Sequence, residues 1–214
     1  MQKYNVLVMN KKIILLTSLL GLLLLTGCDK NSLPDKINAL EEGNKWTLYC
    51  RMSINPEVDN DFYLEQEVKG DTVIEGCSYK KVHNTITGYE DDYKIVEPIS
   101  YFCQEDNKIY EWSNSERVLN YDFGMQVGDT QYSRPGYNFR VESVSNQNMR
   151  NNISLKHLYI TRLSDDNKIV TQNCDVWIEG IGSMNNGLNS CSAGLDGVSW
   201  TLLNFVYQGE ELLK

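Results

Sequence analysis

Apolar and polar residues alternate along most of the chain after residue 45, which is the pattern of half-buried β-strands. The alternation is clearest in residues 46–54, whose apolar face is formed by Trp46, Leu48, Cys50, Met52 and Ile54. It returns in residues 153–163, and turns rich in Gly, Asp and Asn separate such segments. The pattern therefore predicts a chain built mainly from strands.

About eleven strands are expected, closely spaced and without a convincing amphipathic helix between them. Strands in this arrangement form antiparallel meanders that close as a barrel or pack as a sandwich, so the sequence predicts an all-β fold. Gly70-Asp71 is expected to turn the chain between a strand ending at Val68 and one beginning at Thr72. The 13 Tyr and four Trp residues agree with β structure.

The N-terminus has the features of a bacterial lipoprotein signal. Two lysines precede an uncharged apolar stretch, residues 13–25, which is shorter than the roughly 20 residues of a membrane-spanning helix. The stretch ends in a sequence that matches a lipobox, Leu25-Thr26-Gly27-Cys28. We therefore expect that residues 1–27 are removed and that Cys28 carries a lipid. An ordinary signal peptide with a chance cysteine is the alternative.

The mature chain is expected to be anchored to the membrane by this lipid, in the cell envelope and on the outer membrane. Residues 28–44 are polar and are interpreted as a flexible tether that contains at most a short helix from Pro34 through Glu42. Residues 45–214 then form a single all-β domain, which is long enough to bury a stable core.

The chain is acidic, with 20 Lys and Arg against 29 Asp and Glu and a formal net charge of −9. This balance argues against a nucleic-acid partner, because no basic patch is expected that could neutralise phosphates. Its 41% of hydrophobic and 23% of charged residues argue against an intrinsically disordered chain.

Five cysteines remain besides Cys28, and the cell envelope permits disulfides. Cys174 and Cys191 flank a segment rich in Gly and Asn and are the expected disulfide pair, worth about 3 kcal/mol for a loop of that length. Because five is odd, at least one thiol is left over unless it pairs with another chain. Cys50 shares the apolar face of Trp46 and is expected to be a buried thiol.

No common catalytic motif occurs, and the sequence predicts no catalytic residue, metal site or cofactor. His157 lies among strand residues and is interpreted as a packed side chain. Carboxylates are numerous, but no pair stands out as the acid and base of a glycosidase. Aromatic side chains in or near loops are candidates for a sugar-stacking platform; they are Trp112, Tyr89, Tyr93, Tyr101, Tyr132 and Tyr137.

Three motifs follow one another along the chain. They are Glu105-Asp106-Asn107-Lys108-Ile109-Tyr110, then Tyr121-Asp122-Phe123 leading to Val127-Gly128-Asp129-Thr130, then Trp177-Ile178-Glu179-Gly180-Ile181-Gly182-Ser183 with Gly187-Leu188. In this order they resemble secreted proteins and lipoproteins of Bacteroidota, over about residues 46–190. Gln104 departs from the Arg that such proteins usually carry before Glu-Asp. The resemblance implies a phylum and a common fold, and no particular activity.

Two further expectations concern these motifs. Glu179 lies between apolar neighbours and is expected to organise its loop by accepting backbone N–H groups, with a binding role as the alternative. The resemblance also implies that Asp-Ser or Asp-Thr followed by a small or apolar residue can be O-glycosylated. Asp71-Thr72-Val73 fits that rule, so Thr72 is the predicted glycan site.

Together these features predict a lipid-anchored, non-catalytic envelope protein that binds or scaffolds a partner, such as a glycan or another envelope protein. A lipocalin-like barrel that binds a small ligand is one alternative, and an apolar interior cavity would favour it. A glycan-binding or glycan-hydrolysing component of nutrient capture is another, and an exposed aromatic shelf beside paired carboxylates would favour that function.

Overall fold

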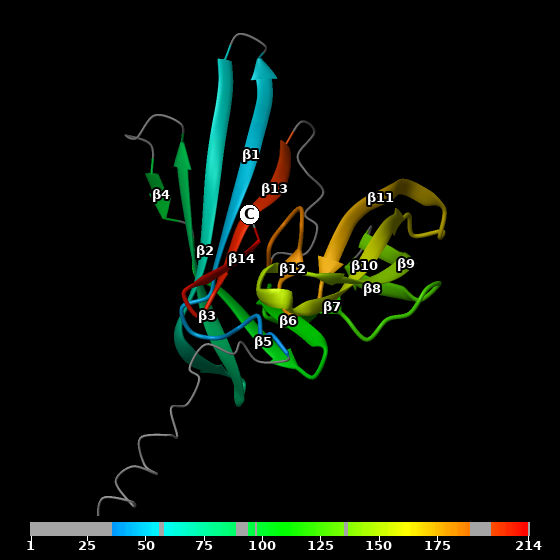
Figure 1. The fold of residues 1–214 in the computed structure, drawn as a ribbon, viewed down its shortest axis with the longest axis horizontal. Coiled ribbons are helices and arrows are strands. Elements are labelled where there is room, and N and C mark those ends of the chain that lie inside the picture. The colour runs from blue at the N-terminus through cyan, green and yellow to red at the C-terminus, as the bar shows by residue number, and fades with distance from the viewer. Residues whose placement is uncertain are drawn as a thin grey trace, which may run out of the picture. The chain divides into compact units, whose positions relative to one another are not determined.

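The computed structural model describes residues 36–55, 58–88, 94–96, 98–134, 137–188 and 198–213. They form an all-β domain of antiparallel sheets, which confirms the predicted fold class (Figure 1). Fourteen strands and one short 3-10 turn, η1 (Arg150–Asn152), are present in this part of the chain. The strand number exceeds the expected eleven because strands of two to four residues carry too little alternation to be recognised.

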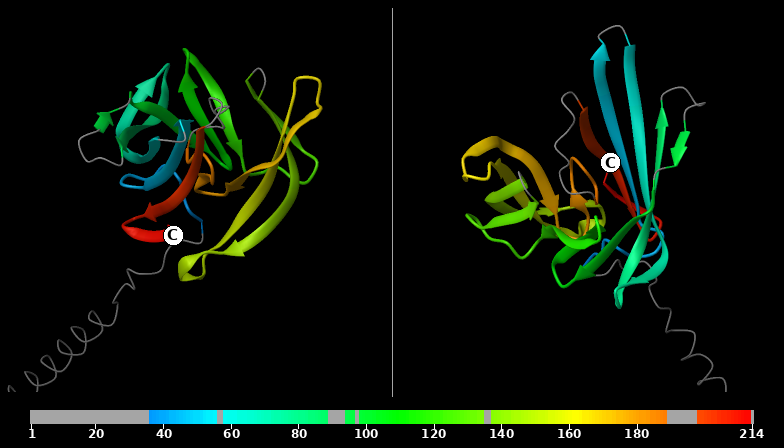
Figure 2. Two further views of the ribbon diagram at one scale, coloured as in Figure 1. Left: turned by 90° about the horizontal axis from the view of Figure 1, so that it is seen from above. Right: turned by 180° about the vertical axis from the view of Figure 1, so that it is seen from behind.

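The larger sheet has nine strands in the order β14-β13-β1-β2-β3-β5-β6-β7, with β4 also paired to β3. Their bounds are β1 (Lys45–Asn55), β2 (Val58–Ile74), β3 (Cys77–Gly88), β4 (Lys94–Val96), β5 (Ser100–Glu105), β6 (Lys108–Ser113), β7 (Glu116–Asp122), β13 (Val198–Tyr207) and β14 (Glu210–Leu213). This sheet curves as a half-barrel, as the two views of Figure 2 show. It is open in the described residues, because β14 and β7 end the order without pairing to each other.

The smaller sheet has five strands in the order β12-β11-β10-β9-β8. Their bounds are β8 (Thr130–Arg134), β9 (Tyr137–Asn148), β10 (Ser154–Leu163), β11 (Ile169–Ile178) and β12 (Gly182–Ser183). Trp177 of this sheet packs edge-on against Tyr121 of the larger one, with 5.1 Å between ring centroids. The two sheets therefore share one aromatic core.

Alternation gives the curved sheet an inner and an outer face. The inner face carries buried apolar side chains, among them Trp46, Leu48, Val68, Val82 and Phe102. Residues 179–188, named here the core loop, cover this face. The indole Nε1 of Trp46 donates to the carbonyl of Ile181 at 2.8 Å, and the hydroxyl of Tyr121 donates to the carbonyl of Gly187 at 3.0 Å.

The expected turn at Gly70-Asp71 is wrong. Strand β2 continues through it to Ile74, with a shift of register between Val68 and Asp71. The shift is a β-bulge, and Gly70 has the positive φ, +80°, that bulges often require. The chain turns instead at Glu75 and Gly76, both of which also have positive φ.

The C-terminal part of the expected tether is also wrong, because residues 36–44 pack into the domain. Ile37 and Leu40 are buried, and the side-chain amide of Asn44 donates to two backbone carbonyls within the segment, each at 3.0 Å. The short helix expected here is replaced by turns in residues 36–42. The spacing of Ile37 and Leu40 fits one face of a helix, but in the structure both side chains reach the core from a segment of turns.

The signal peptide, residues 1–27, and the lipid-bearing Cys28 lie outside the described residues. Within the described residues, no helix has the length and apolar character needed to span a membrane.

Candidate functional site

The outer face of strands β3, β5, β6 and β7 gathers aromatic and cationic side chains. Register pairs Lys81 with Tyr101, Cys103 with Tyr110, and Trp112 with Arg117. Because side chains two residues apart on a strand share a face, all of them lie on one surface. We name this surface the aromatic face and define it by Tyr79, Lys81, Tyr101, Cys103, Tyr110, Trp112 and Arg117.

The rings of the aromatic face hold one another in place. Trp112 meets Tyr79 edge-on, with ring centroids 6.0 Å apart, and the guanidinium of Arg117 lies 3.8 Å from the ring centroid of Tyr110. Tyr79 is only 2% exposed, whereas Trp112, Tyr110 and Tyr101 are half-buried. The buried ring of Tyr79 thus supports Trp112, and Arg117 supports Tyr110, so these two rings are held in place before any ligand arrives.

Arg117, one of the two cationic residues of the aromatic face, is paired with a carboxylate. Arg117 forms an ion pair with Glu105 at 2.6 Å, and this hydrogen-bonded pair lowers the pKa of Glu105 and raises that of Arg117. Burial raises the pKa of both Tyr79 and Cys103. Cys103 therefore remains a thiol near neutral pH and is a poor nucleophile.

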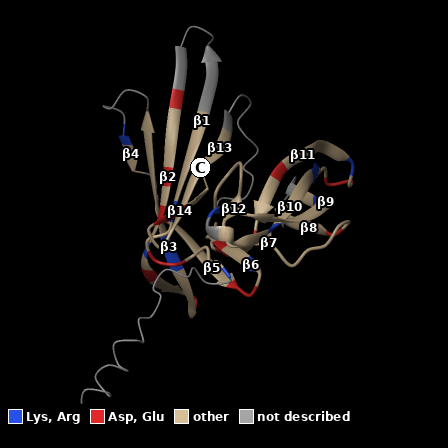
Figure 3. Cartoon of the chain, in the orientation of Figure 1, with Lys and Arg blue, Asp and Glu red and all other residues tan. Residues whose placement is uncertain are grey.

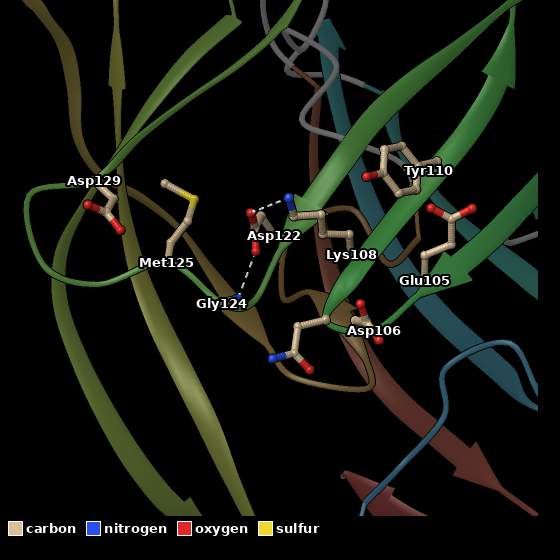
Figure 4. A pocket seen from close by; sticks show the side chains of 9 residues that line it. Glu105, Asp106, Lys108, Tyr110, Asp122, Gly124, Met125 and Asp129 are labelled. Carbon is tan, nitrogen blue, oxygen red and sulfur yellow. Dashed lines mark hydrogen bonds and ion pairs between the residues drawn. The ribbon is translucent and has the colours of Figure 1, made fainter.

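A hollow of about 520 Å³ lies between the β5–β6 turn and the chain segment after β7 (Figure 4). Four carboxylates line it, namely Glu105, Asp106, Asp122 and Asp129, together with Tyr110, Asn107 and Lys108. Asp122 pairs with Lys108 at 3.4 Å and accepts the backbone N–H of Gly124 at 2.8 Å. The cartoon of Figure 3 colours Asp and Glu red, including those at the β5–β6 turn.

This arrangement suits a polar ligand that has both a flat apolar surface and several hydrogen-bonding groups. Half-buried rings of Tyr101, Tyr110 and Trp112 offer apolar contact, and carboxylate and amide oxygens of the hollow offer acceptors. No group of three or more metal-ligating side chains lies close together in the described ranges.

The candidate sugar-stacking residues do not lie together. Tyr101 and Trp112 share the aromatic face, on neighbouring strands. Tyr132 is 62% exposed but belongs to β8 of the smaller sheet. Tyr89 and Tyr93 lie outside the described residues, and so does the side chain of Tyr137.

Five members of the aromatic face were not recognised as site candidates in the sequence: Tyr79, Lys81, Cys103, Tyr110 and Arg117. Tyr110 and Trp112 alternate around Glu111 in β6, which is a local signal that they share a face. The sequence gives no comparable signal for Tyr79 or Arg117, because only the pairing of β3 with β5 and of β6 with β7 places them there.

Asp175, rather than the predicted Glu179, organises the core loop. Its carboxylate accepts hydrogen bonds from the hydroxyl of Ser183 at 2.6 Å, from the indole of Trp177 at 3.2 Å and from two backbone N–H groups. Burial raises the pKa of Asp175 to about 6. The side chain of Glu179 is half-buried and makes no hydrogen bond or ion pair with another described residue; its backbone N–H donates to Lys156.

The structure describes the surroundings of three further residues singled out in the sequence, Thr72, Cys174 and Cys50. Thr72 lies half-buried in β2, opposite Tyr79 and near the end of the β2–β3 hairpin. The thiol of Cys174 donates to the carbonyl of Ile160 at 3.4 Å, and Cys191 lies outside the described residues. No disulfide joins two cysteines within the part of the chain that the structure describes. Cys50 is buried there, at 0% exposure.

No protein-family model matches this chain, and comparisons with curated proteins and with solved structures find no match.

Proposed function

We propose that this chain is a lipid-anchored protein of the cell envelope that binds carbohydrate on the outer face of its larger sheet. The observation that carries the proposal is the aromatic face, where Tyr101 and Trp112 lie on neighbouring strands and Tyr110 lines a hollow that also bears four carboxylates. Aromatic rings stack on the apolar faces of sugar rings, and carboxylates accept hydrogen bonds from sugar hydroxyls.

Rigidity supports a binding function for this surface. Trp112 and Tyr110 are held by Tyr79 and Arg117, so ordering them on binding costs little conformational entropy. The lipocalin-like alternative has less support, because the inner face of the half-barrel is covered by the core loop. Trp46 on that face is fully buried, and its indole N–H donates to the carbonyl of Ile181 within that packing.

Replacement of Trp112 by alanine is expected to weaken polysaccharide binding about tenfold, because the largest half-exposed ring of the surface is lost. The measurement is affinity electrophoresis of the mature protein through gels that contain a panel of neutral and acidic polysaccharides, followed by calorimetry on the best ligand. Trp112→Phe keeps an aromatic ring and is expected to retain most of the affinity.

Tyr132→Ala is the matched control, because Tyr132 is an exposed aromatic residue of the other sheet. It is expected to bind as the wild type does. Equal losses in both variants would point to non-specific aromatic contact. Failure of the wild-type protein to bind any polysaccharide would overturn the proposed function.

The lipid anchor is tested separately with Cys28→Ser. The wild-type protein is expected to incorporate labelled palmitate and to sediment with membranes, and the variant to do neither, because only a thiol can receive the diacylglyceryl group. Protease treatment of intact and lysed cells then shows on which side of the outer membrane the domain lies. Equal membrane association of both variants would contradict the anchor.

A further inference from the structure

A row of four outer-face residues crosses the strands of the aromatic face and carries a cation at each end. Register pairs Lys81 with Tyr101 and Trp112 with Arg117, and continuing the β5–β6 pairing of Phe102 with Glu111 by one residue sets Tyr101 opposite Trp112. The order along the row is therefore cation, ring, ring, cation. It crosses three inter-strand spacings, about 14 Å in all.

We propose that this row binds an anionic saccharide, a sugar chain that bears carboxylate or sulfate groups, with Tyr101 and Trp112 under the sugar rings and Lys81 on an anionic substituent. The inference rests on the proposed carbohydrate-binding function and names the class of sugar. Tyr101 and Trp112 alone would stack on a neutral sugar as well, so the expected preference for an anionic sugar depends on the cations.

Lys81 is the cation available to a ligand. It is half-buried and forms no ion pair with another described residue, although its neighbours on the sheet are paired: Lys80 with Asp71, and Lys69 with Glu67. The basic residues of β3 are blue in Figure 3. A half-buried, uncompensated ammonium beside two rings gains more from an anion than a fully solvated one, because less water screens the pair.

Arg117 has a different role at the other end of the row. Its charge is compensated by Glu105, and its guanidinium carbon lies 3.8 Å from the ring centroid of Tyr110. It supports the rings and keeps Glu105 from repelling an anion at this end of the surface. The carboxylates of the hollow lie beyond this pair, next to Lys108. The row is thus less acidic than the surface around it, in a chain whose net charge is −9.

The experiment compares polymers that differ only in charge. Mature protein in detergent is titrated with polygalacturonate and with the same polymer after full methyl esterification, and in parallel with dextran sulfate and unsulfated dextran. Lys81→Gln is expected to weaken binding of the anionic polymer about tenfold, the loss for one charged hydrogen bond, and to leave the neutral polymer unchanged. Lys81→Arg is expected to restore binding.

Lys168→Gln is the control, because Lys168 lies on the exposed β10–β11 turn of the other sheet and its loss removes the same charge. Binding that follows carboxylate and not sulfate, or the reverse, identifies the anionic group. Equal binding of charged and neutral polymers would overturn the inference and leave the proposed function standing. Absence of binding to every polymer, charged or neutral, would overturn both.

Discussion

Replacement of Asp175 by alanine is expected to lower the free energy of unfolding by about 3 kcal/mol at neutral pH. The carboxylate is 3% exposed and accepts hydrogen bonds from Ser183, Trp177 and the backbone of Val176 and Asn185. Alanine leaves these donors buried without an acceptor and releases the turn that precedes Gly187. Urea denaturation followed by tryptophan fluorescence measures the loss.

Asp71→Ala provides the comparison. Asp71 also has a partner, Lys80, but its side chain is 60% exposed, so the expected loss is below about 1 kcal/mol. Equal effects at the two positions would mean that the Asp175 network does not hold the core loop.

The same carboxyl gives the domain a pH dependence that Asp175→Asn is expected to remove. Its pKa is about 6 in the folded protein and near 3.8 in the unfolded chain, so protonation favours the folded state. The part of its stability that depends on protonation is complete below about pH 4 and is lost as pH rises to about 6, by about 3 kcal/mol in total, whereas the hydrogen bonds that the carboxylate accepts remain at neutral pH. The difference in unfolding free energy between the wild-type protein and the asparagine variant, measured from pH 4 to 7, is expected to fall over that interval.

Replacement of Gly182 by alanine is expected to prevent stable folding or to cost several kcal/mol. Gly182 has a φ of +112°, which L-residues rarely adopt, and an added Cβ would collide with the carbonyl oxygen of Gly187. The collision is with backbone, which cannot move aside without breaking the paired hydrogen bonds between Ser183 and Gly187. Expression of soluble protein and its melting temperature report the effect.

Gly209→Ala separates the two causes of strain. Gly209 also has a positive φ, +86°, but nothing lies within 4 Å of an added Cβ. The expected cost is about 1 kcal/mol, for the backbone conformation alone. If Gly182→Ala lowered the free energy of unfolding by no more than Gly209→Ala does, the core loop would have to shift to accept a side chain.

Alternation in the sequence predicted the strands that matter most for the fold. Residues 46–54 lie in β1, and residues 154–163 of the second alternating segment form β10. Where Gly and Asp occur together the local signal was ambiguous, because a positive φ serves a turn and a bulge equally. Strand pairing shows that Gly70 lies in a bulge and not in a turn, because β3 pairs with β2 on both sides of Gly70.

The candidate site depended on information that alternation does not contain. Trp112 and Tyr101 were recognised as candidates. Their neighbours Lys81 and Arg117 were not, because they lie on other strands and a local hydrophobic pattern does not specify the order of strands in a sheet. Likewise, Asp175 and Glu179 are both acidic residues beside the same tryptophan. Asp175 lies inside β11 and is buried, whereas Glu179 follows the end of that strand and is half-buried, and this difference separates a buried acceptor from a side chain without a partner in the described structure.

The closure of the inner face has a consequence for how the chain folds. Strand β1 pairs with β13, and Trp46 donates to Ile181, which is 135 residues away in sequence. Such distant contacts raise the contact order, which slows folding to milliseconds or longer. During synthesis from the N-terminus, β1 must wait for β13 with that edge unpaired and its apolar face uncovered. Until the C-terminal strands arrive, the nascent domain therefore exposes a strand edge and an apolar surface that favour aggregation.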